Sequence, residues 1–263
     1  MSNDTYTRYI EAISNIKNAN DLVNSNFKSD NGYREVLEHV SNEIGLEYLE
    51  IIKDKFKEFY KNFKYKLIEL CNKNDKIGDP VKYDFTNNDF INCSSTNLRY
   101  ILHSLIIIDY IKECKLNNLD IIEIGGGYGG LCYFLYNIAE LYNININSYS
   151  IFDLEKVNNL SSIYLNHQLN NKKINTYTLN DNYKDGLKEN SFLISNYAYS
   201  EISQKYQDEY TDKIINPYIS YGFLTWNTDY NRINNIIKNK QIMREKEYPL
   251  TYYLNLYVKI KPF

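Results

Sequence analysis

The spacing of apolar residues divides the chain near residue 119. Up to about residue 74, apolar side chains recur at intervals of three and four residues, which is the period of a helix with one buried face. The repeat is clear at Val36, Leu37, Val40 and Ile44. A stretch rich in turn formers, "NDKIGDPVKYDFTNND", then interrupts it. The helical period resumes at Ser95 or Thr96, either of which can cap the new helix.

Beyond residue 119, short apolar runs alternate with helical patterns. This alternation is typical of a mainly parallel sheet that is covered on both faces. The strands that we predict are Ile121–Ile124, Ser148–Phe152, Ile174–Thr178, Phe192–Ser195, Ile219–Trp226, Gln241–Tyr248 and Tyr252–Ile260. The helices that we predict between them are Gly130–Tyr142, Leu154–Gln168 and Ser203–Ile215.

The last two predicted strands are joined by "EYPLT", which is too short for a helical crossover. They must form a hairpin, so the final strand runs antiparallel to its neighbour. We therefore predict an α/β fold with a Rossmann-like sheet that is mainly parallel and has an antiparallel C-terminal hairpin strand. This sheet would occupy residues 90–263, and residues 1–89 would form a helical N-terminal cap.

A glycine-rich turn follows the first predicted strand, in "IIEIGGGYGGL". Glycine tolerates positive φ angles and lets a ligand lie against the main chain. Gly125, Gly127 and Gly130 match the dinucleotide fingerprint G-x-G-x-x-G. Glu123, followed by Gly125, Gly127 and Gly129, matches E-x-G-x-G-x-G, the first motif of methyltransferases that use S-adenosylmethionine (SAM). Spacing alone does not separate the two patterns.

Charge separates the two cofactors. A dinucleotide would bring its pyrophosphate near Glu123, where like charges repel each other. SAM brings a positive ammonium and a positive sulfonium, which a carboxylate stabilises. After the second predicted strand, Asp153 can accept hydrogen bonds from both ribose hydroxyls, and it can also cap the helix that follows. Glu123 and the terminal hairpin thus favour SAM over a dinucleotide.

Four segments together resemble a family of sugar O-methyltransferases that use SAM. They are "IIEIGGGYGGL", "YSIFDLEKVNNLSSIYL", "FLISNYAYSEISQKYQDEYTDKII" and "YGFLTWN". The resemblance runs in order from about Cys93 to the C-terminus. It departs from the family where Glu155 and Lys156 follow Leu154, because the proline of the family's D-L-P-E motif is missing. The resemblance implies a class I methyltransferase that releases S-adenosylhomocysteine (SAH) and methylates a hydroxyl of a sugar, a nucleotide sugar or a glycan.

Cofactor contacts are predicted for the turn and for the segments around it. Arg99 precedes the first predicted strand of the sheet. Its guanidinium can pair with the methionine carboxylate or with an acidic sugar, and its alternative role is a surface salt bridge. The cofactor-binding residues that we predict are Arg99, Glu123, Gly125, Gly126, Gly127, Gly129, Asp153, Leu154 and Asn196.

Methyl transfer to a sugar hydroxyl calls for a general base near the end of the fourth strand. Our candidate is Glu201, and its alternative role is to cap or pair with the helix that begins near Ser203. The substrate-binding residues that we predict are Tyr197, Tyr199 and Asn227. Structural roles are expected for His39, His103 and His167, with His103 a hydrogen-bonded residue at the edge of the core.

Composition restricts the classes of partner that the chain is expected to have. With a formal net charge of −3, the chain has no basic footprint for nucleic acid. Its four cysteines form no C-x-x-C pair, so neither a disulfide framework nor a metal site is expected. No leader or span of membrane length is visible, so we expect a cytoplasmic protein. The sequence leaves open the oligomeric state, a homo-oligomer included.

Three other functions also remain open at this stage. Nothing in the residues identifies the acceptor, so a methyltransferase of a small molecule other than a sugar fits the same motifs. A dinucleotide-dependent oxidoreductase matches the glycine spacing but not the charge of Glu123. A SAM-binding protein without catalysis would keep the same turn and the same acids.

Overall fold

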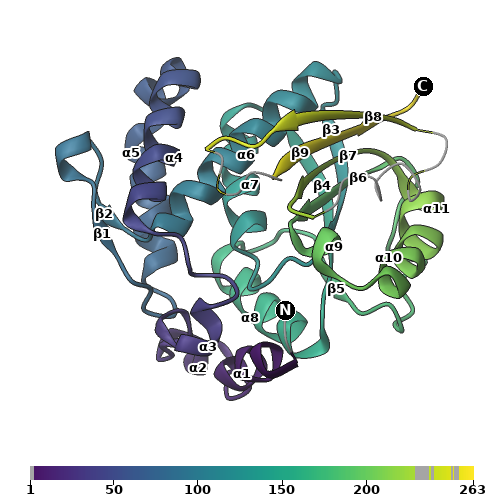
Figure 1. The fold of residues 1–263 in the computed structure, drawn as a ribbon, viewed down its shortest axis with the longest axis horizontal. Helices are drawn as coiled ribbons and strands as arrows, with labels where there is room; N and C mark the ends of the chain where they lie inside the picture. The colour runs from purple at the N-terminus through teal and green to yellow at the C-terminus, as the bar shows by residue number, and fades with distance from the viewer. Residues whose placement is uncertain (1–2, 229–236, 238–239, 250, 252–254) are drawn as a thin grey trace.

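The computed structural model describes residues 3–228, 237, 240–249, 251 and 255–263. Its centre is a seven-stranded sheet with the order β5-β4-β3-β6-β7-β9-β8 (Figure 1). β3 to β7 run parallel, whereas β9 is antiparallel to β7 and to β8. The predicted fold is confirmed, including its antiparallel C-terminal strand. The strands are β3 (Asn118–Ile124), β4 (Asn145–Phe152), β5 (Ile174–Tyr177), β6 (Ser191–Asn196), β7 (Ile219–Trp226), β8 (Gln241–Lys246) and β9 (Leu256–Lys261).

The C-terminal hairpin is shorter than predicted. β8 ends at Lys246 rather than Tyr248, and β9 begins at Leu256. The predicted start of the last strand, Tyr252, lies outside the described residues. β9 lies between β7 and β8 and pairs its Leu256 with Trp226 of β7. β9, the second strand of the hairpin, therefore pairs with the parallel part of the sheet, and β8 forms the edge.

Helices cover both faces of the sheet. Residues of α6, α7 and α8 share an apolar cluster with Ile121, whereas residues of α10 and η3 share another with Ile122. The two clusters differ because successive residues of a strand point to opposite faces. These helices and their neighbours are α6 (Ser95–Glu113), α7 (Gly130–Leu141), α8 (Glu155–Gln168), α9 (Ala198–Glu201), α10 (Gln204–Tyr210), the π-helical turn η3 (Thr211–Ile215) and α11 (Asn216–Tyr218).

The cap of α6 lies one residue before the predicted ones. The Ser94 hydroxyl oxygen accepts a hydrogen bond from the Thr96 N–H at 3.2 Å, and Ser95 is the first residue of the helix. A serine oxygen in this position satisfies one of the N–H groups that the first turn leaves without an intrahelical partner. Ser94, and not Ser95 or Thr96, is therefore the N-cap.

The N-terminal helices pack onto α6 and α8. α1 and α2 contact α8, and α4 contacts α6 (Figure 1). Leu49 and Ile52 of α4 belong to the same apolar cluster as Ile121, so the core is continuous across residue 89. The division into two domains stays a prediction. The elements are α1 (Asn3–Ile13), α2 (Ala19–Val23), η1 (Phe27–Ser29), α3 (Asn31–Arg34), α4 (Asn42–Lys55), α5 (Lys57–Asp75), β1 (Tyr83–Asp84), η2 (Thr86–Asn88) and β2 (Asn92–Cys93).

The described residues were compared with the requirements of a membrane-spanning helix and of a metal site. No helix in the described part has both the length and the apolar content that crossing a membrane requires. Within the same residues, no three histidine, cysteine, aspartate or glutamate side chains gather as ligands of a metal ion would.

Candidate cofactor and acceptor site

The glycine turn connects the end of β3 to the start of α7. Gly125, Gly127 and Gly129 have φ angles of 77°, 56° and 93°, a region that side chains strongly disfavour. A Cβ atom on Gly125 would lie 2.0 Å from the Cβ atom of Ala198. The turn therefore lies directly against the loop that follows β6, and Gly125 is required by both its backbone conformation and this close approach.

Asp153 follows β4 and faces the turn. Its Oδ2 accepts a hydrogen bond from the Gly127 N–H at 3.0 Å, and its Oδ1 accepts one from the Leu154 N–H at 2.7 Å. Each carboxylate oxygen keeps a second lone pair that can accept a ribose hydroxyl. Burial raises the pKa of Asp153 to about 6. The N-cap of α8 is Leu154, without a side-chain hydrogen bond, so the predicted alternative of Asp153 as N-cap is not observed.

Leu154 presents an apolar side chain beside this carboxylate. The side chain is 49% exposed. It offers an aliphatic surface next to Asp153 that a flat ring could cover.

Glu123 lies underneath the turn. Its side chain is buried, and its Oε2 accepts a hydrogen bond from the Tyr149 hydroxyl at 2.9 Å. A Cβ atom on Gly126 would lie 3.1 Å from the same oxygen. Burial raises the pKa of Glu123 to about 7. When ionised, this carboxylate places a negative charge directly below the turn, where it attracts a bound cation.

Arg99 is buried in α6, so the predicted alternative of a surface salt bridge is wrong. Its Nη2 donates to the carbonyl oxygen of Leu37 at 3.1 Å, and its Nε has no hydrogen-bond partner. It forms no ion pair within the described residues. A Cβ atom on Gly127 would lie 2.8 Å from Leu37. The segment that Arg99 holds therefore lies on the glycine turn, and Arg99 keeps one donor, Nε, without a partner among the described residues.

The loop after β6 begins with two residues that we predicted. Asn196 accepts a hydrogen bond from the Thr225 hydroxyl at 2.6 Å. Tyr197 has a φ angle of 68°, which is rare for a residue with a side chain. Its N–H donates to the Thr225 carbonyl oxygen at 3.1 Å, and its hydroxyl donates to Glu247. The end of β6 and the end of β7 are thus fixed to each other at the edge that carries the turn.

Glu201 and Asn227 are brought together, although they come from α9 and from the end of β7. The Asn227 amide donates to Glu201 Oε1 at 2.5 Å, and Glu201 is exposed. α10 has Ser203 as its N-cap and no side-chain cap, so the alternative of Glu201 as a helix cap is not observed. Burial raises the pKa of Tyr6 in α1, and the charges of Glu201 and Asp153 raise it further. α1 therefore lies beside the two acids.

Tyr199 lies in the core instead of facing this loop. Its ring is buried, its hydroxyl is 2.7 Å from the Thr211 hydroxyl, and it makes an edge contact with Trp226 at a centroid distance of 6.1 Å. Both rings belong to the cluster that contains Ile122. These contacts give Tyr199 and Trp226 a packing role on the α10 side of the sheet.

The three histidines lie in different environments. His39 lies in the loop before α4 and His167 in the last turn of α8, and both are exposed. His103 in α6 is buried, but its Nε2 has no hydrogen-bond partner within the described residues. Burial, followed by the nearby Arg99, lowers the pKa of His103 to about 3, so its imidazole is neutral. A side-chain hydrogen bond with Asn196 opposes this lowering of the pKa, and the structural role expected for His103 stays a prediction.

Glu247 is a functional candidate that the sequence did not reveal. It follows β8, is 2% exposed, and accepts hydrogen bonds from the Thr251 hydroxyl and the Asn255 amide, both at 2.7 Å, in addition to that from Tyr197. In the sequence it stands in "EYPLT", where an acid resembles an ordinary turn residue. Only the contact with the residue after β6 distinguishes it.

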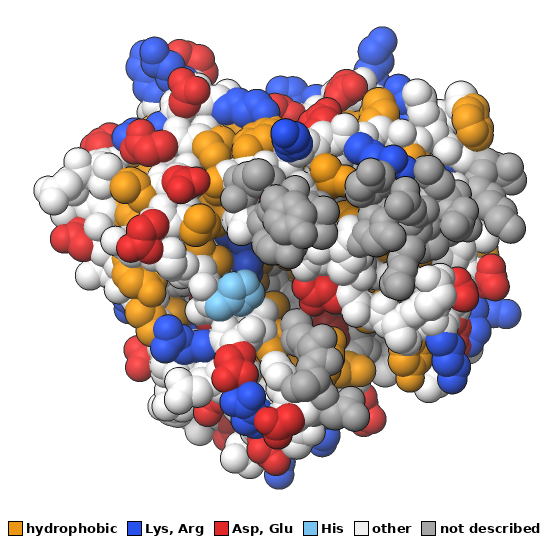
Figure 2. Space-filling view, viewed as in Figure 1, with side chains coloured by type: hydrophobic (Ala, Val, Ile, Leu, Met, Phe, Trp, Pro, Cys, Tyr) orange, Lys and Arg blue, Asp and Glu red, His pale blue; other side chains and the backbone are white. Residues whose placement is uncertain are grey.

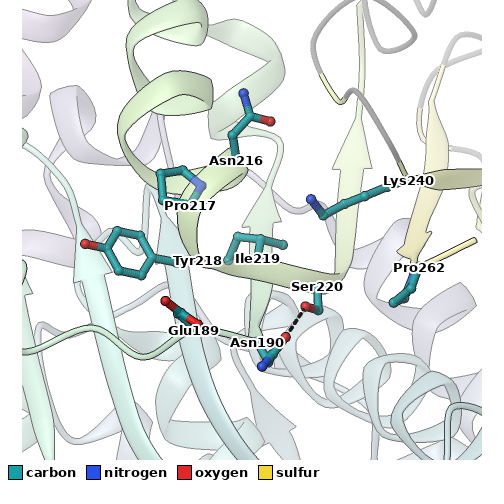
Figure 3. A pocket seen from close by; sticks show the side chains of 9 residues that line it. All are labelled: Glu189, Asn190, Asn216, Pro217, Tyr218, Ile219, Ser220, Lys240 and Pro262. Carbon is teal, nitrogen blue, oxygen red and sulfur yellow. Dashed lines mark hydrogen bonds between the residues drawn. The ribbon is translucent and has the colours of Figure 1, made fainter.

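The surface is hollowed near the predicted site and also far from it. The face shown in Figure 2 is hollowed near its centre, where histidine, basic and acidic side chains surround the depression. A separate cavity of about 310 Å³ lies at the amino ends of β6 and β7, where Ser220 donates to Asn190 at 2.7 Å (Figure 3). This cavity is at the opposite end of the strands from the glycine turn and contains none of the predicted site residues.

Comparisons with known proteins give distant structural similarity alone. No family model matches the sequence, and no curated protein matches it. Magnesium protoporphyrin IX methyltransferase (ChlM) from Synechocystis PCC 6803 with bound SAM is 11% identical, with 84% of this chain and 99% of that chain covered and a TM-score of 0.48. A SAM-dependent methyltransferase from Methanococcus maripaludis is 12% identical, with 60% and 84% covered and a TM-score of 0.45. An O-methyltransferase family protein from Burkholderia thailandensis is 9% identical, with 64% and 58% covered and a TM-score of 0.44.

Proposed function

We propose that this chain is a SAM-dependent O-methyltransferase that acts on a hydroxyl of a sugar, a nucleotide sugar or a glycan. The observation that carries the proposal is the glycine turn, with its positive φ angles, between Glu123 below it and Asp153 beside it. The choice of a sugar rests on the sequence resemblance alone. The choice of SAM rests on the charge and position of the side chains.

The residues around the turn suit the parts of SAM. Asp153 would accept the ribose hydroxyls, and the exposed side chain of Leu154 would contact the adenine. Glu123 would attract the ammonium, and the unpaired Nε of Arg99 would donate to the methionine carboxylate. A buried guanidinium without an anion is costly, and a bound carboxylate removes that cost. When bound, SAM supplies an activated methyl group that an acceptor oxygen can take.

The acceptor would lie beside the loop after β6. Asn196, Tyr197 and Asn227 offer hydrogen bonds to hydroxyl groups there. Among the described residues, Glu201 and Glu247 are carboxylic acids on this side, and a carboxylate can take the proton of a hydroxyl as the methyl group is transferred.

A dinucleotide suits the same geometry less well. Its pyrophosphate would approach the turn directly above the Glu123 carboxyl, and two negative groups would then share a site of low dielectric. A SAM-binding protein without catalysis would need the same turn, so binding and turnover have to be measured separately.

Calorimetric titration of the purified protein with SAH, NAD and NADP tests the cofactor. We expect SAH to bind and the dinucleotides not to bind. Asp153→Ala should abolish SAH binding because the ribose loses its acceptor, whereas Asp54→Ala, at an exposed position of α4, should leave it unchanged. Binding of a dinucleotide alone would refute the proposed function.

Release of SAH from SAM in the presence of nucleotide sugars, free sugars and non-sugar alcohols tests the acceptor. The proposal expects turnover with at least one sugar compound. Turnover confined to a non-sugar acceptor would keep the methyltransferase and remove the sugar, and SAH binding without any turnover would favour a binding protein.

A further inference from the structure

Glu247 is a buried carboxyl group with no cationic partner among the described residues. Within the same residues its side-chain donors are neutral groups, namely the hydroxyls of Tyr197 and Thr251 and the amide of Asn255. It forms no ion pair within the described part of the chain. A buried charge that is neutralised only by hydrogen bonds is costly, and an uncharged amide could satisfy the same hydroxyl donors. A carboxyl group in a buried place that an amide could fill points to a chemical role.

Tyr197 links this carboxylate to the glycine turn. It stands between Asn196, the last residue of β6, and Ala198, whose Cβ is in contact distance of Gly125. Its φ angle of 68° is held by hydrogen bonds from its N–H to Thr225. Backbone strain that neighbours enforce in this way is concentrated at functional sites. The strained conformation directs the phenol towards Glu247 while the next residue stays on the turn.

The surroundings of the phenol keep it protonated at rest. Burial, followed by the charge of Glu247, raises the pKa of Tyr197 well above its usual value. The groups that face it are Tyr48 of α4 and Arg99 and His103 of α6. Tyr257 of β9 contacts the same histidine. A protonated phenol cannot take a proton unless it passes its own to another group. The Tyr197 hydroxyl donates to such a group, because Glu247 accepts its hydrogen bond.

We propose that Tyr197 is the catalytic residue that receives the proton of the acceptor hydroxyl, and that Glu247 acts through it as the final proton acceptor, in place of Glu201. This inference rests on the proposed function. As the O–H bond of the acceptor breaks, its proton moves to the phenolic oxygen of Tyr197, and the phenolic proton moves to Glu247. The acceptor oxygen uses the freed electron pair to bond to the methyl carbon, and the electron pair of the broken C–S bond stays on sulfur.

Position and exposure favour this pair over Glu201. The Glu201 side chain is exposed, so bulk water competes for the hydroxyl that it would have to contact. Glu247 is buried and Tyr197 is half-buried, and in a place of low dielectric a hydrogen bond between a phenol and a carboxylate is stronger than in water. The residue that carries the phenol also adjoins the turn on which we place the cofactor.

Turnover of the acceptor that the wild-type protein uses is the first test. We expect Tyr197→Phe and Glu247→Gln each to lower kcat by about 10²–10⁴-fold, while SAH affinity stays the same. Glu245→Gln, two residues earlier on β8 and exposed, is the matched control and should keep wild-type activity.

Two results of this test would overturn the inference. If Glu201→Gln loses turnover while Glu247→Gln keeps it, the exposed acid is the base. If Glu247→Gln weakens SAH binding but not the binding of 5′-methylthioadenosine, which lacks the amino-acid part, Glu247 holds the ammonium of SAM. A wild-type protein that binds no SAH would instead refute the proposed function, so the two failures are distinguishable.

A second test needs no acceptor. 3-Fluorotyrosine is placed at position 197, and its ¹⁹F resonance is compared in the SAH and SAM complexes. We expect the resonance to move between the two, because only SAM carries a positive sulfonium, and to move again in Glu247→Gln. The same label at Tyr65, which is 82% exposed on α5, is the control and should show neither change. A resonance at position 197 that is the same in both complexes would place the phenol away from the reacting centre and refute the inference.

Discussion

Glu123 combines a predicted function with a cost in stability. Its pKa of about 7 lies above the ordinary value of 4.5, so the native state holds more protons than the unfolded state between these two values. The stabilising contribution is therefore complete at acid pH and is lost as pH rises through 7. Glu123→Gln, which cannot ionise and can still accept from Tyr149, should gain unfolding free energy over the wild type between about pH 5 and pH 8, on the order of 3 kcal/mol.

Urea unfolding at these two pH values measures the effect on stability, and titration with SAH measures the effect on SAH affinity. The variant should bind SAH more weakly at the higher pH, since the ammonium loses a carboxylate. Glu58→Gln, at an exposed position of α5, should change neither quantity. If the stability difference between Glu123→Gln and the wild type is the same at both pH values, the ionisation of Glu123 does not change between them, which contradicts the prediction.

Single residues were predictable where their neighbours in sequence define them. Gly125, Gly127 and Asp153 follow strands directly, so the letters alone indicate a turn and an acid at one edge of the sheet. Glu247 was missed because its burial depends on Tyr197, fifty positions away in the chain, as much as on the hairpin. Whether the Nε2 of His103 has a partner depends on packing that sequence spacing does not contain.

At the scale of elements, the contact between the glycine turn and the loop after β6 is testable. Gly125→Ala would place a methyl group 2.0 Å from Ala198 and force a side chain into a φ angle of 77°. We expect a loss of about 2–5 kcal/mol in unfolding free energy, from overpacking and from the left-handed backbone together. Adding Ala198→Gly should recover the overpacking part, roughly half of the loss, and leave the backbone part. Chemical denaturation of the two single variants and the double variant measures the cycle, and a double variant as unstable as the sum of both would contradict the contact.

The elements themselves were largely predictable because their apolar periods differ. The strands of the parallel part and the helices α7 and α8 match the predicted ranges closely. The single helix expected at Ser203–Ile215 divides into α10 and the π-helical turn η3, followed by Pro217. Hydrogen-bond registers within a helix do not change its apolar period by much, so this detail is invisible in the sequence.

At the scale of the whole molecule, one buried network connects the N-terminal segment to the turn. Lys28 is fully buried in η1, and its Nζ donates to the carbonyl oxygen and to Oδ1 of Asn74 at 3.1 Å and 3.0 Å. The Asn74 amide donates to the hydroxyl of Tyr128, a residue of the glycine turn, at 3.0 Å. The Tyr164 hydroxyl of α8 donates to the same asparagine at 2.7 Å. Helical periodicity predicted that the N-terminal segment is helical, but not that polar side chains join it to the turn.

This network predicts that the N-terminal segment and the sheet unfold together and that their stability depends on Lys28. Burial lowers the pKa of Lys28 from 10.5 to about 8, so between these values the unfolded state holds a proton that the native state lacks. The contribution of Lys28 to stability must then rise as pH increases through this window. The difference in unfolding free energy between the wild type and Lys28→Met should change in favour of the wild type by up to roughly 3 kcal/mol between about pH 7 and pH 10.

Circular dichroism and tyrosine fluorescence should report a single unfolding transition for both proteins. Lys213→Met, at a surface position that forms an ion pair with Glu209, is the control and should show no such dependence on pH. Two separate transitions, with only the first sensitive to Lys28, would mean that residues 1–89 are a domain of their own, in agreement with the division predicted from the sequence. A single transition that shifts with pH as stated would mean that the turn and the N-terminal helices form one cooperative unit, so that a cofactor bound on the turn would also stabilise those helices.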